Sequence, residues 1–142
     1  MPLEGGPAAQ VTRNGGLFAQ ESLDGRKLYF LRPQEAATFD ANRPGIWVKS
    51  LPAGPEAMVK GTERVQTRYF AISRSGIYFI HNVNRRWILS LLNLSTGRIQ
   101  ALRTLDHRQF GSPSLAISPD EKTLLYTWIE ADADLMLVDN FR

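Results

Sequence analysis

A pattern that occurs three times along the chain constrains its fold more than any other feature. In each copy a short apolar run is followed by a polar turn that contains serine, and then by a second apolar run. The copies span residues 18–30, 70–79 and 115–126, and their serine anchors are Ser22, Ser73 and Ser118. The anchors lie 51 and 45 residues apart. A chain with such a period is expected to fold as similar units that stack on their neighbours.

Each copy has the pattern of a β-hairpin. Its apolar residues alternate with polar ones or form short β-branched and aromatic runs, as is typical of strands. Asp24-Gly25 and Pro119-Asp120 favour tight turns, because glycine adopts positive φ without steric cost and proline presets φ at the first corner. Further strands are expected at residues 45–51, 87–94, 98–102 and 134–139. Helix signals are weak, and the best helix candidate covers only residues 34–37.

Four strands in each repeat correspond to one blade of a β-propeller, whose blades recur at about 40–50 residues. We therefore predict an all-β propeller fragment of about three four-stranded blades. We assign the blades to residues 17–66, 67–109 and 110–142, with three strands in the last blade. Residues 1–16 are expected to supply an outer strand that completes a blade at the ring junction.

Three blades are too few for a ring, because propellers contain about 4–8 blades. Two copies would give six, so we predict a homodimer that closes into one six-bladed ring. The N-terminal strand is continuous with the first blade, and it is therefore expected to join the third blade of the other copy. This closure leaves no unpaired sheet edge. The alternative is that the chain is one piece of a longer propeller.

The third copy, from Leu115 to Tyr126, resembles the Ser-Pro-Asp-Gly-Lys repeat of TolB-like propellers of the WD type. Glu121 stands where glycine is usual, and in the first copy Leu23 replaces the usual proline. Residues 11–16 and 134–142 resemble the end portion of large bacterial regulators that carry an N-terminal winged-helix domain and a C-terminal propeller. The resemblance implies a fragment of a bacterial transcriptional regulator, with the part that reads DNA outside this sequence.

Composition narrows the possible functions. The net charge is +3 and is dispersed, whereas a nucleic-acid interface would show a denser stripe of Lys and Arg, so we expect no direct nucleic-acid binding. The absence of cysteine excludes disulfides, zinc-thiolate sites and cysteine nucleophiles. No apolar run reaches the roughly 18 residues of a membrane span. The compartment stays open between bacterial cytoplasm and periplasm.

The sequence offers little for catalysis. It has no Gly-x-Ser-x-Gly elbow and no phosphate-binding glycine loop. The two histidines, His81 and His107, come without further ligands at metal spacing. We therefore predict a protein that is not an enzyme and needs no metal or cofactor.

The remaining prediction is an interaction, sensor or scaffold module that binds a protein or peptide on a loop face. The candidate residues precede the inner strands, and one further aromatic departs from the positional pattern: Arg68, Tyr69, His107, Arg108, Gln109, Phe110 and Trp128. Two alternatives stay open. In the first, the propeller is accessory to a serine peptidase or other hydrolase whose catalytic domain lies elsewhere. In the second, the chain is a pure assembly unit.

Overall fold

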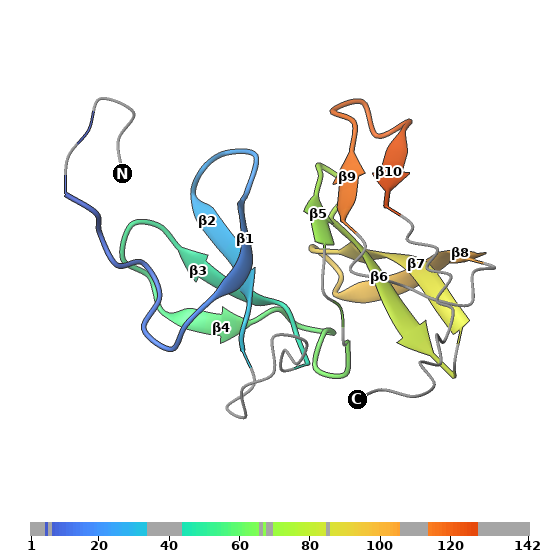
Figure 1. Cartoon of the computed structure of the whole chain (residues 1–142), viewed down its shortest axis with the longest axis horizontal. Coiled ribbons are helices and arrows are strands. Elements are labelled where there is room, and N and C mark those ends of the chain that lie inside the picture. Colours follow the sequence, from blue (N-terminus) through green and yellow to red (C-terminus); the bar gives the residue numbers. More distant parts are fainter. Residues whose placement is uncertain are drawn as a thin grey trace, which may run out of the picture.

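The structure is a computed structural model, and it describes residues 5, 7–33, 44–65, 67, 70–84, 86–105 and 114–127. Every regular element among these residues is a β-strand, which confirms the all-β prediction (Figure 1). The strands are β1 (Leu17–Glu21), β2 (Lys27–Leu31), β3 (Trp47–Ser50), β4 (Glu56–Met58), β5 (Phe70–Ile72), β6 (Ile77–Val83), β7 (Arg86–Asn93), β8 (Arg98–Leu105), β9 (Leu115–Ile117) and β10 (Leu124–Tyr126).

The strands form three separate antiparallel sheets. The first sheet has the order β1-β2-β3-β4, the second has the order β5-β6-β7-β8, and the third is the hairpin β9-β10. Each of the two larger sheets is a meander in which neighbours in sequence are neighbours in space. The expected strands at 45–51, 87–94 and 98–102 are thus present as β3, β7 and β8. The strand expected at 134–139 and the short helix candidate at 34–37 lie outside the described residues.

The inner strands of the second sheet, β5 and the first part of β6, are covered on both faces, whereas β8 is exposed except for Leu105. Along β6, Ile77 and Phe79 enter a core shared with the first sheet, whereas Tyr78 and Ile80 enter a core shared with the third sheet. Successive side chains of a strand point to opposite faces, so an almost continuous apolar run is what a strand between two packed layers requires. The first core contains Tyr29, Leu31, Ile46, Val59, Val65, Phe70, Ile77, Phe79 and Leu92, and the second contains Ala71, Ile80, Leu105 and Leu115.

The first strands of the three sheets lie next to one another. β5 contacts both β1 and β9, and the turns that follow these three strands gather along the upper edge of Figure 1. The side chain of Gln20 joins two of the sheets. Its Nε2 donates to the main-chain oxygen of Phe70 at 2.8 Å, and its Oε1 accepts from the N–H of Ile72 at 3.3 Å. Polar atoms at this junction are therefore satisfied across the sheet boundary.

The turns after β1 and β9 repeat the same hydrogen bonds. Ser22 donates to Asp24 while accepting from the N–H of Lys27, and Ser118 does the same with Asp120 and Thr123. In both turns the serine hydroxyl is the first cause of a lowered pKa of the aspartate, followed by a main-chain N–H. The polar turns predicted from the repeat are therefore real structural equivalents.

The third turn adds a contact between sheets. Glu121 has a φ of +58°, where the first turn has Gly25 with a φ of +66°. Its carboxylate accepts hydrogen bonds from the N–H groups of Arg74 and Ser75 and from the Ser75 hydroxyl, all in the turn between β5 and β6. These bonds lower the pKa of Glu121, the Ser75 hydroxyl first. The glutamate thus stands in a backbone conformation that favours glycine because it reaches the neighbouring sheet.

The N-terminal residues differ from the expected outer strand. Residues 7–16, here called the strap, form no strand with any described part of this chain. The strap runs instead across the side of the first sheet that faces away from the second sheet (Figure 1). The outer strand was predicted to pair with a second copy, and the structure contains a single chain. The outer strand and the blade boundaries at 17–66, 67–109 and 110–142 therefore stay predictions.

Candidate functional site

The ligand-facing residues predicted from sequence all lie outside the described residues: Arg68, Tyr69, His107, Arg108, Gln109, Phe110 and Trp128. The described residues around them differ in burial. Phe70, which begins β5, lies in the first core and Leu105, which ends β8, lies in the second core, whereas Ser114 and Thr127 are exposed. The loop face that these residues were predicted to form therefore stays a prediction.

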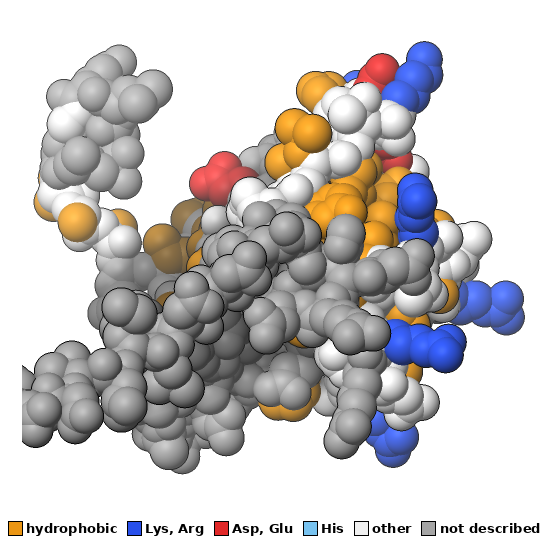
Figure 2. All heavy atoms as spheres, turned by 45° about the vertical axis from the view of Figure 1, so that its right-hand side comes forward, with side chains coloured by type: hydrophobic (Ala, Val, Ile, Leu, Met, Phe, Trp, Pro, Cys, Tyr) orange, Lys and Arg blue, Asp and Glu red, His pale blue; other side chains and the backbone are white. Residues whose placement is uncertain are grey.

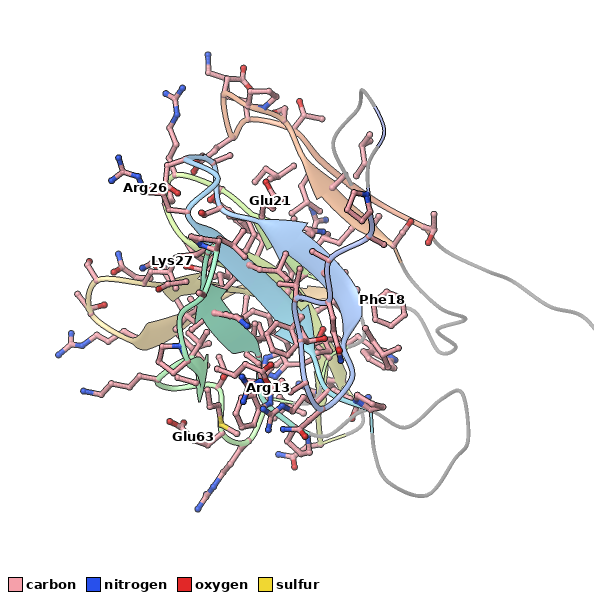
Figure 3. The ribbon with its side chains drawn as sticks, turned by 90° about the vertical axis from the view of Figure 1, so that its left-hand side faces the viewer. Arg13, Phe18, Glu21, Arg26, Lys27 and Glu63 are labelled. Atoms are coloured by element: carbon pink, nitrogen blue, oxygen red, sulfur yellow. The ribbon has the colours of Figure 1, made fainter. Side chains whose placement is uncertain are left out.

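A polar cavity of about 610 Å³ lies between the strap and the outer face of the first sheet. Figure 3 looks onto this side of the molecule, with Arg13 against the sheet and Phe18 at its edge. The cavity is lined by Gln10, Val11, Arg13, Asn14, Arg32, Lys49, Pro52, Ala53, Gly54, Pro55 and Glu56. It brings together residues from the strap, from the end of β2 and from β3, β4 and their connecting turn.

Strand register places the charged residues on one face. Lys49 of β3 lies opposite Glu56 of β4, and Trp47 of β3 lies opposite Phe30 of β2. Their neighbours Tyr29 and Val48 point the other way, into or against the first core. Because side chains alternate along a strand, the same four strands present an apolar face to the second sheet and a mixed, charged face to the strap.

Arg32 and Glu56 form the fixed part of the cavity wall. Their side chains are ion-paired at 2.6 Å, and both are largely buried. The guanidinium group of Arg32 also lies 3.5 Å from the centre of the Trp47 ring, which is a cation–π arrangement. The other oxygen of Glu56 accepts the main-chain N–H of Arg13 at 2.9 Å, and this bond and the Arg32 bond lower the pKa of Glu56, the N–H of Arg13 first.

The strap is held mainly by polar contacts. Lys49 Nζ donates to the main-chain oxygen of Val11 at 2.6 Å, in addition to the bond between Arg13 and Glu56. Phe30 is fully buried although it lies on the outer face, and the strap residue Gly16 lies against its ring. The strap thus covers the most apolar side chain of this face and leaves the polar cavity beside it.

Two buried donors lack an acceptor among the described residues: Arg32 Nε, whose side chain lines the cavity, and Trp47 Nε1, whose ring lies against the Arg32 guanidinium group. Buried polar groups are nearly always hydrogen-bonded, so such a pair of N–H groups calls for an explanation. Sequence reasoning missed this site. The alternation of β3 and β4 places Lys49 and Glu56 outward, but nothing in the sequence brings Arg13 and Arg32 to them.

A second, smaller hollow of about 340 Å³ lies by the other face of the first sheet, lined by residues that include Tyr29, Val48 and Leu94. His81 is half-buried and its Nε2 lies 3.1 Å from the Ser90 hydroxyl, and burial lowers its pKa. Within the described ranges, no three metal-ligating side chains converge.

No helix in the described part of the chain has the length and apolar character needed to cross a membrane. Comparison of the chain with models of protein families, with curated proteins and with solved structures finds no match.

Proposed function

We propose that the chain is a non-catalytic interaction or scaffold module, built as three blades of a TolB-like β-propeller. The observation that carries this proposal is the burial of the inner strands of the second sheet between the two neighbouring sheets. A middle sheet whose inner strands contact a core on each face, with its first strand beside the first strands of the flanking sheets, is the arrangement expected of successive propeller blades.

Assembly with a second copy follows from the two outermost faces. The outer face of the third sheet carries Ala116 and Leu125, because their neighbours Leu115 and Leu124 point into or against the second core. Leu125 is 68% exposed. Figure 2 shows apolar side chains by this hairpin, with Lys and Arg side chains along the right-hand rim. Repeat proteins bury such faces against a further repeat or cover them with a cap.

In this proposal two copies close into one six-bladed ring. The outer face of the first sheet then receives the third sheet of the partner, and the strap leaves that face to become an outer strand of the partner's blade. The contacts from Lys49 to Val11 and from Arg13 to Glu56 are few and polar, which makes such a displacement feasible. The parent protein in this proposal is a bacterial regulator, on the resemblance of the repeat and of the C-terminal residues.

Sedimentation velocity over a range of concentrations tests the assembly. We expect a species with twice the 16.0 kDa mass of the chain. Leu125→Glu places a charge on the exposed sheet face and should convert the dimer to monomer. Leu23→Glu is the matched control, since Leu23 is 67% exposed but lies in a turn. A monomer at every concentration, or equal effects of the two variants, would overturn the proposal.

A further inference from the structure

The cavity beneath the strap has a surplus of positive charge that the described residues do not neutralise. Its lining holds three cationic side chains, those of Arg13, Arg32 and Lys49, and one carboxylate, that of Glu56. Glu56 is already engaged through both oxygens, one by Arg32 and one by the main-chain N–H of Arg13. Among the described residues, no carboxylate forms an ion pair with the side chain of Arg13 or Lys49.

Lys49 is placed to meet a ligand in this cavity. Its half-buried stem lies on the sheet and its Nζ is held at one point by the main-chain oxygen of Val11. An ammonium group has three donors, so two remain after the bond to Val11. Because the ammonium group is partly buried, a neighbouring anion would interact with it more strongly than with a charge in open solvent.

Arg32 adds a positive charge of fixed position. Its Nη2 is bonded to Glu56 and its guanidinium group lies over Trp47, so this group cannot turn freely. Its Nε is buried and does not meet a ligand in the cavity directly. The side chain lines the cavity, however, and its charge favours an anion there.

We propose that the cavity binds a small organic anion, a molecule bearing a carboxylate or phosphate group, through the side chains of Lys49 and Arg13, with the charge of Arg32 beside them. Small-molecule sites commonly have volumes of about 300–1,000 Å³, and the cavity of about 610 Å³ falls within that range. The site adds a ligand function to the chain with the strap docked, whereas in the proposed ring the strap leaves this face. Ligand binding and ring closure therefore compete, and binding is measured at a concentration at which sedimentation shows the single chain.

Nuclear magnetic resonance of the 15N-labelled chain provides a direct test. The protein is titrated separately with inorganic phosphate and with succinate, and sodium chloride at equal ionic strength serves as the reference. We expect saturable shifts of the main-chain signals of Val11, Lys49 and Glu56, accompanied by a shift of the Arg32 Nε–H signal. The arm that saturates at lower concentration identifies phosphate or carboxylate as the preferred group.

Four variants separate binding from folding. Lys49→Met should raise the dissociation constant of the ligand at least about tenfold, as expected when a charge-assisted hydrogen bond to the ligand is lost. Arg13→Gln should weaken it less, and Lys49→Arg should retain binding. Lys122→Met removes the same charge from the exposed turn after β9 and should leave binding unchanged. Equal shifts with chloride, equal affinities of Lys49→Met and Lys122→Met, or shifts spread outside the cavity lining would each overturn the proposal.

Discussion

The junction between the first two sheets depends on Gln20, and replacing this residue by leucine tests that dependence. Gln20→Leu keeps the side-chain volume but removes both hydrogen bonds to β5, one to the oxygen of Phe70 and one from the N–H of Ile72. A neutral hydrogen bond in a protein contributes about 0.5–1.5 kcal/mol, so the two together contribute about 1–3 kcal/mol. Since leucine regains part of this by apolar burial, we expect a net loss of about 1–2 kcal/mol.

Urea denaturation followed by tryptophan fluorescence measures the effect. With a denaturant slope of about 2 kcal/mol per molar, the midpoint should fall by roughly 0.5–1 M without a change in slope. Gln100→Leu is the matched control, because Gln100 is an exposed residue of β8 that makes no hydrogen bond through its side chain within the described residues. If Gln20→Leu costs no more than Gln100→Leu, the polar link between the sheets does not stabilise the fold and the reasoning fails.

Three further predictions concern other parts of the fold. Thr62→Val should lower the free energy of unfolding in urea by about 1–3 kcal/mol, because the N–H of Ile46 loses its bond to the buried Thr62 hydroxyl at 3.0 Å. Thr62→Ser keeps the hydroxyl and should cost only about 1 kcal/mol for the lost methyl group, so equal losses would contradict this reasoning. Gly76→Ala should lower the thermal midpoint of unfolding more than Gly25→Ala, because a Cβ at Gly76 would stand 2.0 Å from a main-chain oxygen. At Gly25 only the φ of +66° opposes alanine, at a cost of about 1–2 kcal/mol, so an equal drop in the two variants would refute the prediction. Burial lowers the pKa of His81 in the folded state. As the pH drops from about 7 to 5, the unfolded chain therefore takes up a proton at His81 before the folded chain does, and the free energy of unfolding should fall. His81→Gln should flatten the pH dependence in this window, above the range where the lowered pKa values of Asp24 and Asp120 act, and an unchanged slope would exclude His81 as its source.

Local pattern was enough to predict the strands and their turns. Ser22 and Ser118 each stand two residues before an aspartate, and the side chains make the same hydrogen bonds in both turns. Such bonds join side chains to nearby backbone and need no distant partner, so the local sequence is enough to predict them. The nearly continuous apolar run at the start of β6 likewise follows from strand geometry, since successive side chains point to opposite faces and both faces are covered. The departure of Glu121 from the usual glycine was visible in the sequence, but its cause lies in the neighbouring sheet.

The all-β class, several strand positions and the polar turns after β1 and β9 followed from the sequence, because they depend on the pattern of apolar residues and on local turn chemistry. Tertiary structure alone decided that the strap crosses the first sheet and that Arg13, Arg32, Lys49 and Glu56 surround one cavity. These residues are up to 43 positions apart, and what joins them is a set of single hydrogen bonds with no periodic signature. A pattern can reveal which face of a strand is buried, but only packed coordinates reveal which distant segment covers the other face.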